Sequence, residues 1–133
     1  MGYTQYWGAN KRPNKELLTD VKSIISKAES QGIIIRGWDG NGEPEITADR
    51  ISFNGDKATD NNYETFMLNG LSSFCKTAER PYDAVVCAVL LRFSHDDPSF
   101  EIGSDGIWDE EWKPGRKLYH DVFNEEAAKP KGL

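Results

Sequence analysis

Residues 14–32 read NKELLTDVKSIISKAESQG, and their apolar positions recur with the period of an α-helix. Steps of one and three residues separate these positions, which predicts an amphipathic helix over 14–31. Asn10 or Asn14 is suited to cap its start, with Pro13 in the first turn, and Gly32 supplies a left-handed residue that ends it. The apolar positions are Leu17, Leu18, Val21, Ile24, Ile25 and Ala28.

A second stretch, residues 82–94, follows Pro81 and is apolar on almost every side. Its 13 residues are too many for a typical strand, so we predict a buried central helix. Asp83 then lies in the first turn, where a negative charge is favourable. A short last helix is expected to begin at Pro114.

Short segments rich in β-formers surround these helices, at 2–7, 33–38, 45–53, 63–68 and 100–102. Asn54-Gly55 is a strong turn signal. The pattern predicts an α+β fold, in which about three helices pack on a small antiparallel sheet in the order β-α-β-β-(β)-α-β-α. We expect a single domain over residues 1–123 and a flexible C-terminal tail over 124–133.

The composition is that of an ordinary globular domain, with 133 residues, 38% hydrophobic and 29% charged, and a net charge of −6. The longest apolar run, 84–91, is too short to span a bilayer, so no membrane association is expected. Cys75 and Cys87 match no zinc or redox spacing and are expected to be free thiols. Because affinity for nucleic acid comes largely from Lys and Arg on phosphates, direct nucleic-acid binding by this acidic chain is not expected.

Candidate metal and catalytic motifs are incomplete. The segment 39–50 resembles a calcium loop, but Pro44 stands where the loop needs Gly and Arg50 where it needs Glu. The run 95–97, His-Asp-Asp, would need further histidines to hold a metal, and His120 is the only other one in the sequence. The sequence therefore predicts no metal site and no cofactor, and it identifies no catalytic residue.

The segment 74–83, FCKTAERPYD, gives the strongest indication of a binding site. Lys76, Thr77 and Arg80 directly precede the predicted buried helix, whose first N–H groups carry partial positive charge and suit a phosphate or carboxylate. A tryptophan beside a Gly-rich turn is suited to stack an aromatic ring. An ordinary capped helix start with solvated cations is the alternative. The predicted ligand-binding residues are Lys76, Thr77, Arg80, Tyr82 and Trp38.

The segment 96–121 is a second candidate, because it carries eight acidic residues and only three basic ones. Such a surface can imitate a nucleic-acid backbone and bind a host enzyme, whereas the ordinary interpretation is a solvated face. A third hypothesis, a phosphodiesterase-like hydrolase that uses paired carboxylates, stays open, although no pair of acidic residues stands out.

Several blocks of sequence resemble a family of small uncharacterised proteins of tailed phages and prophages. They are the opening Met1–Trp7, the segment Glu64–Phe66, the run Phe74–Asp83, and Ser104-Asp105-Gly106 with a Trp after it. In that family position 5 is often His, and so is the residue before Glu64, whereas this chain has Gln5 and Tyr63.

The absence of both imidazoles favours binding over catalysis in this member. The resemblance implies a protein made in the cytoplasm of a host bacterium. Small phage accessory proteins often sequester host signals or inhibit host enzymes. We therefore expect a non-enzymatic accessory protein that binds a small anionic ligand, plausibly a nucleotide signal of host defence. The alternative partner is a host protein bound by the acidic segment 96–121.

Overall fold

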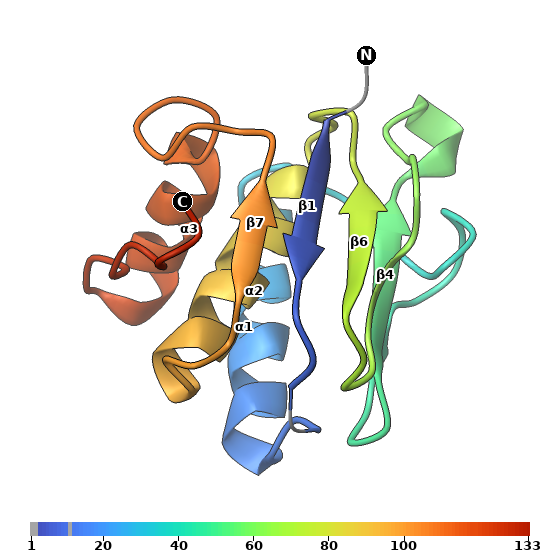
Figure 1. Ribbon diagram of the computed structural model, residues 1–133. Coiled ribbons are helices and arrows are strands. Elements are labelled where there is room, and N and C mark those ends of the chain that lie inside the picture. The colour runs from blue at the N-terminus through green and yellow to red at the C-terminus, as the bar shows by residue number, and fades with distance from the viewer. Residues whose placement is uncertain (1–2, 11) are drawn as a thin grey trace.

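The computed structural model of the protein describes residues 3–10 and 12–133 and confirms the α+β fold (Figure 1). Helix α1 (Lys15–Ser30) is the helix predicted from the opening pattern. The Asn14 side chain caps it by accepting a hydrogen bond from the Leu17 N–H at 2.8 Å, and Gly32 follows it with a φ of +88°. Its apolar stripe faces the core, with Val21, Ile24 and Ala28 fully buried.

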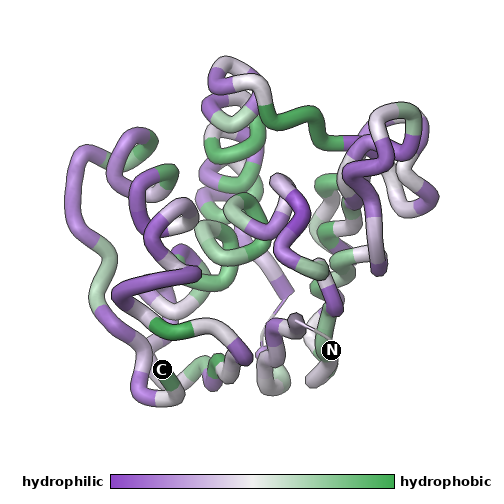
Figure 2. Tube along the Cα trace, turned by 90° about the horizontal axis from the view of Figure 1, so that it is seen from above, coloured by the Kyte–Doolittle hydropathy of each residue, from purple (hydrophilic) through white to green (hydrophobic). Residues whose placement is uncertain are grey.

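Helix α2 (Asp83–Asp96) is the central helix, and ten of its 14 residues are buried. It contacts α1 on one side and α3 (Lys113–Phe123) on the other. Gly115 allows the second contact, since a Cβ atom there would lie only 2.4 Å from the Cβ of Cys87. Seen from above, most hydrophobic positions lie toward the middle of the chain trace (Figure 2).

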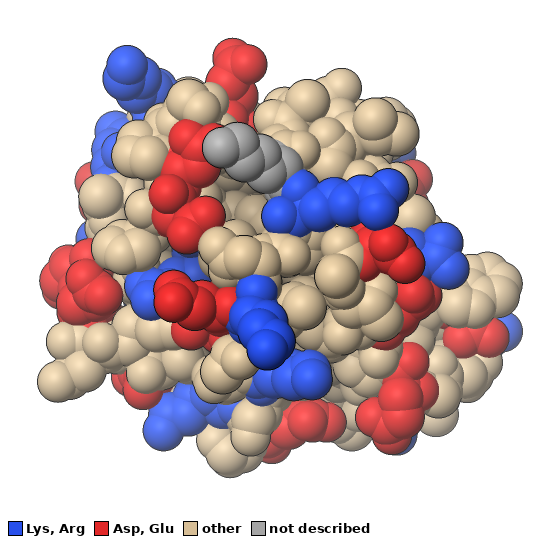
Figure 3. All heavy atoms as spheres, turned by 90° about the horizontal axis from the view of Figure 1, so that it is seen from below, with Lys and Arg blue, Asp and Glu red and all other residues tan. Residues whose placement is uncertain are grey.

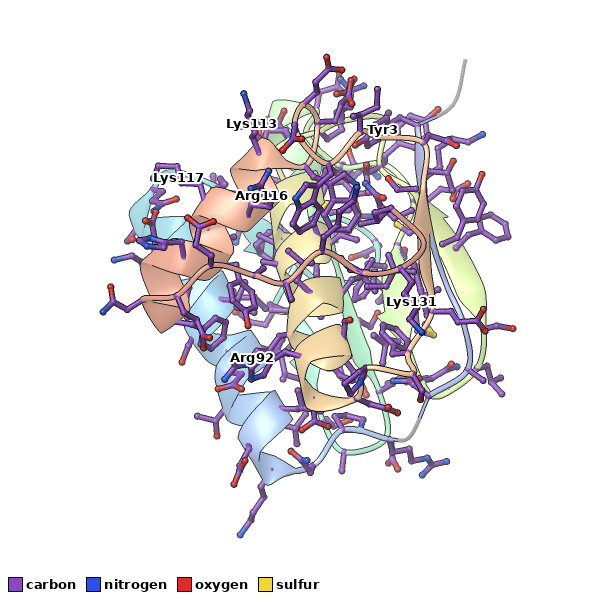
Figure 4. The ribbon with its side chains drawn as sticks, turned by 60° about the vertical axis from the view of Figure 1, so that its left-hand side comes forward. Tyr3, Arg92, Lys113, Arg116, Lys117 and Lys131 are labelled. Atoms are coloured by element: carbon purple, nitrogen blue, oxygen red, sulfur yellow. The ribbon has the colours of Figure 1, made fainter. Side chains whose placement is uncertain are left out.

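Arg92 of α2 ties the three helices together from a partly buried position (Figure 4). Its Nε donates to the Asp20 carboxylate of α1 at 2.9 Å, and one of its terminal nitrogens donates to the Tyr119 hydroxyl of α3 at 2.9 Å. The guanidinium also covers the ring of Phe123 at 3.9 Å from its centroid. The helices therefore form one packed layer on one side of the strands.

Strand β1 (Thr4–Trp7) runs antiparallel between β6 (Ser73–Lys76) and β7 (Ile102–Ser104). Side chains alternate across this sheet, so Gln5 and Cys75 are buried toward the helices. Tyr6 and Phe74 are paired across the strands and point to the opposite side, which we call the outer face.

A second group of strands is built around β4 (Ile51–Gly55), which pairs antiparallel with β2 (Ile35–Arg36), β3 (Glu45–Ile46) and β5 (Phe66–Leu68). Strand β5 lies beside β6 and connects the two groups. Phe66 is fully buried, with its ring centroid 5.0 Å from that of Trp7 and 4.9 Å from that of Phe53. These aromatic contacts join the two groups of strands into one core.

Four local predictions need correction. The segment 45–53, predicted as one strand, contains two, because β3 ends at Ile46 and β4 begins at Ile51. Asn54-Gly55 is not a turn, because both residues end β4 and the Asn54 side chain bonds to neighbouring loops. Strand β6 was not predicted; its residues were assigned to the approach to the central helix. The strand predicted at 100–102 begins later, at Ile102. Gly2, at the start of the predicted first strand, lies outside the described residues.

The last segment, 124–133, returns to the edge strand β7. Gly132 lies so close to this strand that a Cβ atom would meet the Ile102 carbonyl oxygen at 1.8 Å. Pro130 is buried, and Leu133 packs against the core. None of the helices in the described part of the chain has the length and apolarity that crossing a membrane requires.

Candidate functional site: an aromatic and cationic surface

The turn between β6 and α2 holds the backbone in an unusual conformation. Arg80 N–H donates to the Thr77 carbonyl at 3.0 Å, and the two residues between them, Ala78 and Glu79, have φ values of +53° and +56°. Positive φ at both central positions is the requirement of a type I′ turn, which normally takes Asn and Gly. A side chain in this region costs about 1–2 kcal/mol, and such strain gathers at functional sites.

Thr77 and Tyr82, two of the predicted ligand-binding residues, lie in the core. The Thr77 hydroxyl donates to Asp83 Oδ1 at 2.7 Å, and the Tyr82 hydroxyl donates to the Glu64 carbonyl. The Asp83 N–H is also occupied, since it donates to the Arg80 carbonyl at 2.8 Å. The polar groups at the start of α2 therefore bond to one another, and we do not include Thr77 or Tyr82 among the ligand-facing residues.

Asp83 is the centre of this buried polar cluster. Its Oδ1 accepts a second hydrogen bond from Gln5 Nε2 at 3.0 Å, and its Oδ2 accepts a longer one from the Cys87 thiol at 3.6 Å. Burial raises the pKa of Asp83 and outweighs the hydrogen bonds from Gln5 and Thr77, which act to lower it. The cluster fastens the start of α2 to β1 and to the strained turn.

Both cysteines are buried free thiols, as predicted. Burial raises the pKa of the Cys75 thiol to about 12, and it raises the pKa of the Cys87 thiol well above its ordinary value. A thiol that stays protonated is a poor nucleophile and a poor metal ligand. The two cysteines therefore act as core residues.

Lys76 lies at the end of β6, held by its backbone. Its N–H donates to Glu64 Oε1 at 2.8 Å, and its carbonyl accepts the Glu64 N–H at 3.1 Å. Lys76 follows Phe74 by two residues in the strand, so both side chains project on the outer face. Within residues 3–10 and 12–133, the Lys76 side chain has no ion-pair partner.

A buried amide holds two exposed aromatic residues next to each other. Asn54 Nδ2 donates to the carbonyls of Trp38 and Tyr63, at 3.2 and 3.0 Å, and Asn54 Oδ1 accepts the Tyr63 N–H at 3.0 Å. Thr65 donates its hydroxyl to the same Trp38 carbonyl. Asn54 is almost fully buried, whereas Trp38 is 68% exposed and Tyr63 is 46% exposed.

Arg80 places a cation near the ring of Tyr63. Its guanidinium carbon lies 6.0 Å from the centroid of the Tyr63 ring. Its Nε is buried and has no hydrogen-bond partner among the described residues. We define the aromatic–cationic surface as Trp38, Tyr63, Lys76 and Arg80. It contains three of the five predicted ligand-binding residues, and the sequence analysis did not identify Tyr63 as a ligand-binding residue.

Compared with models of protein families, with curated proteins and with solved structures, the chain matches none of them. The function is therefore inferred from the geometry of the site.

A groove of about 730 Å³ runs along α3, and two of the three Lys and Arg side chains that line it are paired with carboxylates. Figure 4 shows Lys113, Arg116 and Lys117 on this helix. Arg116 donates to Asp109 at 3.0 Å, and Lys117 pairs with Asp121 at 2.7 Å. Two cations with internal partners leave a weak attraction for an anion.

The acidic segment 96–121 does not present an uninterrupted acidic strip, because two of its carboxylates pair with the cations of α3. On the face of the molecule seen from below, acidic and basic side chains are interspersed (Figure 3). Among the described residues, no group of three or more His, Cys, Asp and Glu is placed to hold a metal ion.

Proposed function

We propose that the protein binds a small anionic ligand carrying a planar ring, and that the aromatic–cationic surface is the binding site. The proposal depends on one observation: Arg80, which has no ion-pair partner in the described chain, lies 6.0 Å from the ring centroid of the exposed Tyr63, and a buried amide bonds the backbone of Tyr63 to that of the exposed Trp38. Folding alone does not call for this arrangement. An exposed tryptophan gains little from the core, and a buried donor without a partner is unfavourable.

The chemistry of the four side chains is complementary to a nucleotide. Lys76 and Arg80 can each donate charge-assisted hydrogen bonds to a phosphate. Tyr63 and Trp38 offer ring faces on which a base can stack. The likeness to phage and prophage proteins would give such binding a role in the host cytoplasm, as sequestration of a signalling nucleotide used in defence.

The test compares the wild type with Lys76→Ala/Arg80→Ala by calorimetry against AMP. Charge-assisted hydrogen bonds contribute about 1.5–3 kcal/mol each, so loss of both should weaken binding by a factor on the order of one hundred or more. Neither side chain makes an ion pair within the described chain, so the melting temperature should change little. Equal affinities would refute the site.

Lys22→Ala/Lys113→Ala is the matched control, because it removes two exposed lysines from helices outside the surface. It produces the same change in net charge, so a general electrostatic effect would weaken AMP binding by the same factor in both double variants. That outcome would also refute the proposed site.

A further inference from the structure

Tyr6 and Phe74 form an exposed aromatic pair on the outer face. They lie directly opposite each other on β1 and β6, with ring centroids 6.3 Å apart and planes at 41°. Tyr6 is 43% exposed and Phe74 is 58% exposed. The helices pack on the other side of these strands, so they do not cover the pair (Figure 1).

The neighbouring strand leaves one flank of the pair open. Gly103 of β7 lies opposite Tyr6, and it has no side chain to cover the tyrosine ring. A Cβ atom at Gly103 would lie 3.6 Å from the Tyr6 Cβ, so there is room for a side chain that the sequence does not supply. An exposed aromatic pair beside a glycine is suited to stack another planar ring.

The pair and the aromatic–cationic surface are adjacent through Lys76. Phe74 and Lys76 project from the same face of β6, about 7 Å apart along the strand. The backbone of Lys76 is bonded to that of Glu64, the residue after Tyr63. Lys76, which has no ion-pair partner in the described chain, therefore lies between the Tyr6–Phe74 pair and the segment that carries Tyr63.

We propose that the ligand is a dinucleotide, with one base on the Tyr6–Phe74 pair, the second on Tyr63 or Trp38, and the intervening phosphate at Lys76. This inference rests on the proposed function and specifies its ligand. Charge limits the ligand's length, because a chain with a net charge of −6 repels a long polyanion.

The carboxylate of Glu64 is suited to bind the ribose of the same ligand. Its Oε1 accepts the Lys76 N–H, and its Oε2 accepts no hydrogen bond from any described residue. A carboxylate in this position can accept a ribose hydroxyl, as acidic residues do in dinucleotide-binding folds.

The test measures the affinities of pApA and AMP for the wild type, for Tyr6→Ala/Phe74→Ala and for Phe74→Trp. We expect the wild type to bind pApA at least ten-fold more tightly than AMP. Removing both rings should weaken the binding of pApA by a factor of about 5 to 160, the range for loss of one base stack, and leave the affinity for AMP unchanged. Phe74→Trp retains a stacking surface and should retain the preference for pApA.

The outcomes separate the two proposals. If AMP binds through Lys76 and Arg80 but pApA binds no more tightly, the dinucleotide is wrong and the proposed function stands. If neither nucleotide binds, both are wrong. A wild-type dimer that the Tyr6→Ala/Phe74→Ala variant converts to monomer would also overturn the inference, since a second copy would then cover the pair.

Discussion

Aromatic side chains are buried on one side of the strands and exposed on the other. On the helix side, Phe66 is fully buried between Trp7 and Phe53, and every ring face is in contact with the core. On the outer face, Tyr6 and Phe74 contact mainly each other and leave much of their surface in water. The inner rings are explained by the free energy of folding, whereas the outer rings are not.

The cations differ in the same way. Arg92, among the helices, is bonded to Asp20 and Tyr119 and stacks on Phe123. Arg80, in the turn that leads to α2, has a buried Nε without a described partner and lies over the ring of Tyr63, 6.0 Å from its centroid. The polar contacts of Arg92 help to maintain the fold, whereas the Nε of Arg80 has a hydrogen bond left to donate to a ligand.

The largest expected effect compares one residue type on the two sides. Phe66→Ala should lower the free energy of unfolding by about 3–5 kcal/mol, because it opens a cavity among packed rings. Phe74→Ala removes one cross-strand pair and should cost no more than about 1 kcal/mol. Urea denaturation of both variants measures the difference. Similar losses would mean that the outer pair belongs to the core.

A pair of glycines compares the two sides by adding a methyl group. Gly115→Ala would place a Cβ 2.4 Å from that of Cys87, so α2 and α3 must separate, and we expect a loss of about 1–3 kcal/mol. Gly103→Ala, on the outer face, meets only an ordinary contact and should be neutral or slightly stabilising. Thermal unfolding of the two variants decides. A stable Gly115→Ala variant would contradict the packing described for α3.

A substitution in the strained turn should have a smaller effect, which can be measured both on stability and on AMP binding. Glu79→Gly relieves a left-handed side chain and should raise the free energy of unfolding by about 1 kcal/mol. If the rigid turn positions Arg80, the same change should weaken AMP binding, because a glycine lets the turn move. Glu29→Gly, in the last turn of α1, is the control and should be destabilising. Gain of stability with unchanged affinity would show that the strain has no part in binding.

Local patterns in the sequence predicted the helices well and the outer face poorly. The spacing from Leu17 to Ala28 and the apolar run after Asp83 report burial directly, so α1 and α2 were predicted nearly to their ends. Strand β6 is short and polar at its ends, and only its pairing with β1 makes it a strand. Non-local pairing of this kind leaves little trace in one sequence.

The candidate site was half predictable for the same reason. Lys76 and Arg80 were found because they stand close together in the sequence, directly before the predicted buried helix. Tyr63 meets Arg80 only through the tertiary structure. Asn54, which links Tyr63 to Trp38, belongs to Asn54-Gly55, and that dipeptide is locally indistinguishable from a turn. Thr77 was predicted to face the ligand. The sequence does not indicate that the Thr77 hydroxyl instead donates a hydrogen bond to Asp83 in the core.

The smallest expected effect concerns Asp83, a buried carboxyl group on the inner side. Asp83→Asn keeps the oxygen that accepts from Gln5 and Thr77, so the fold should survive the change. The pKa of Asp83 is raised in the folded protein, so the folded state favours the protonated form. Its stabilising contribution is therefore complete below the unfolded pKa of about 4 and is lost as the pH rises through the folded pKa.

The free energy of unfolding of the wild type, relative to that of Asp83→Asn, should consequently fall as the pH rises from about 4 toward neutrality. Urea denaturation of both proteins across this range gives the difference at each pH, which cancels the titration of the other carboxyl groups. Asp96→Asn, an exposed position on the same helix, should show a much flatter difference. A difference for Asp83→Asn that rises with pH would mean that the hydrogen bonds outweigh burial. The cluster would then stabilise the carboxylate form of Asp83, and the helix side of the strands would contain a buried ionised group.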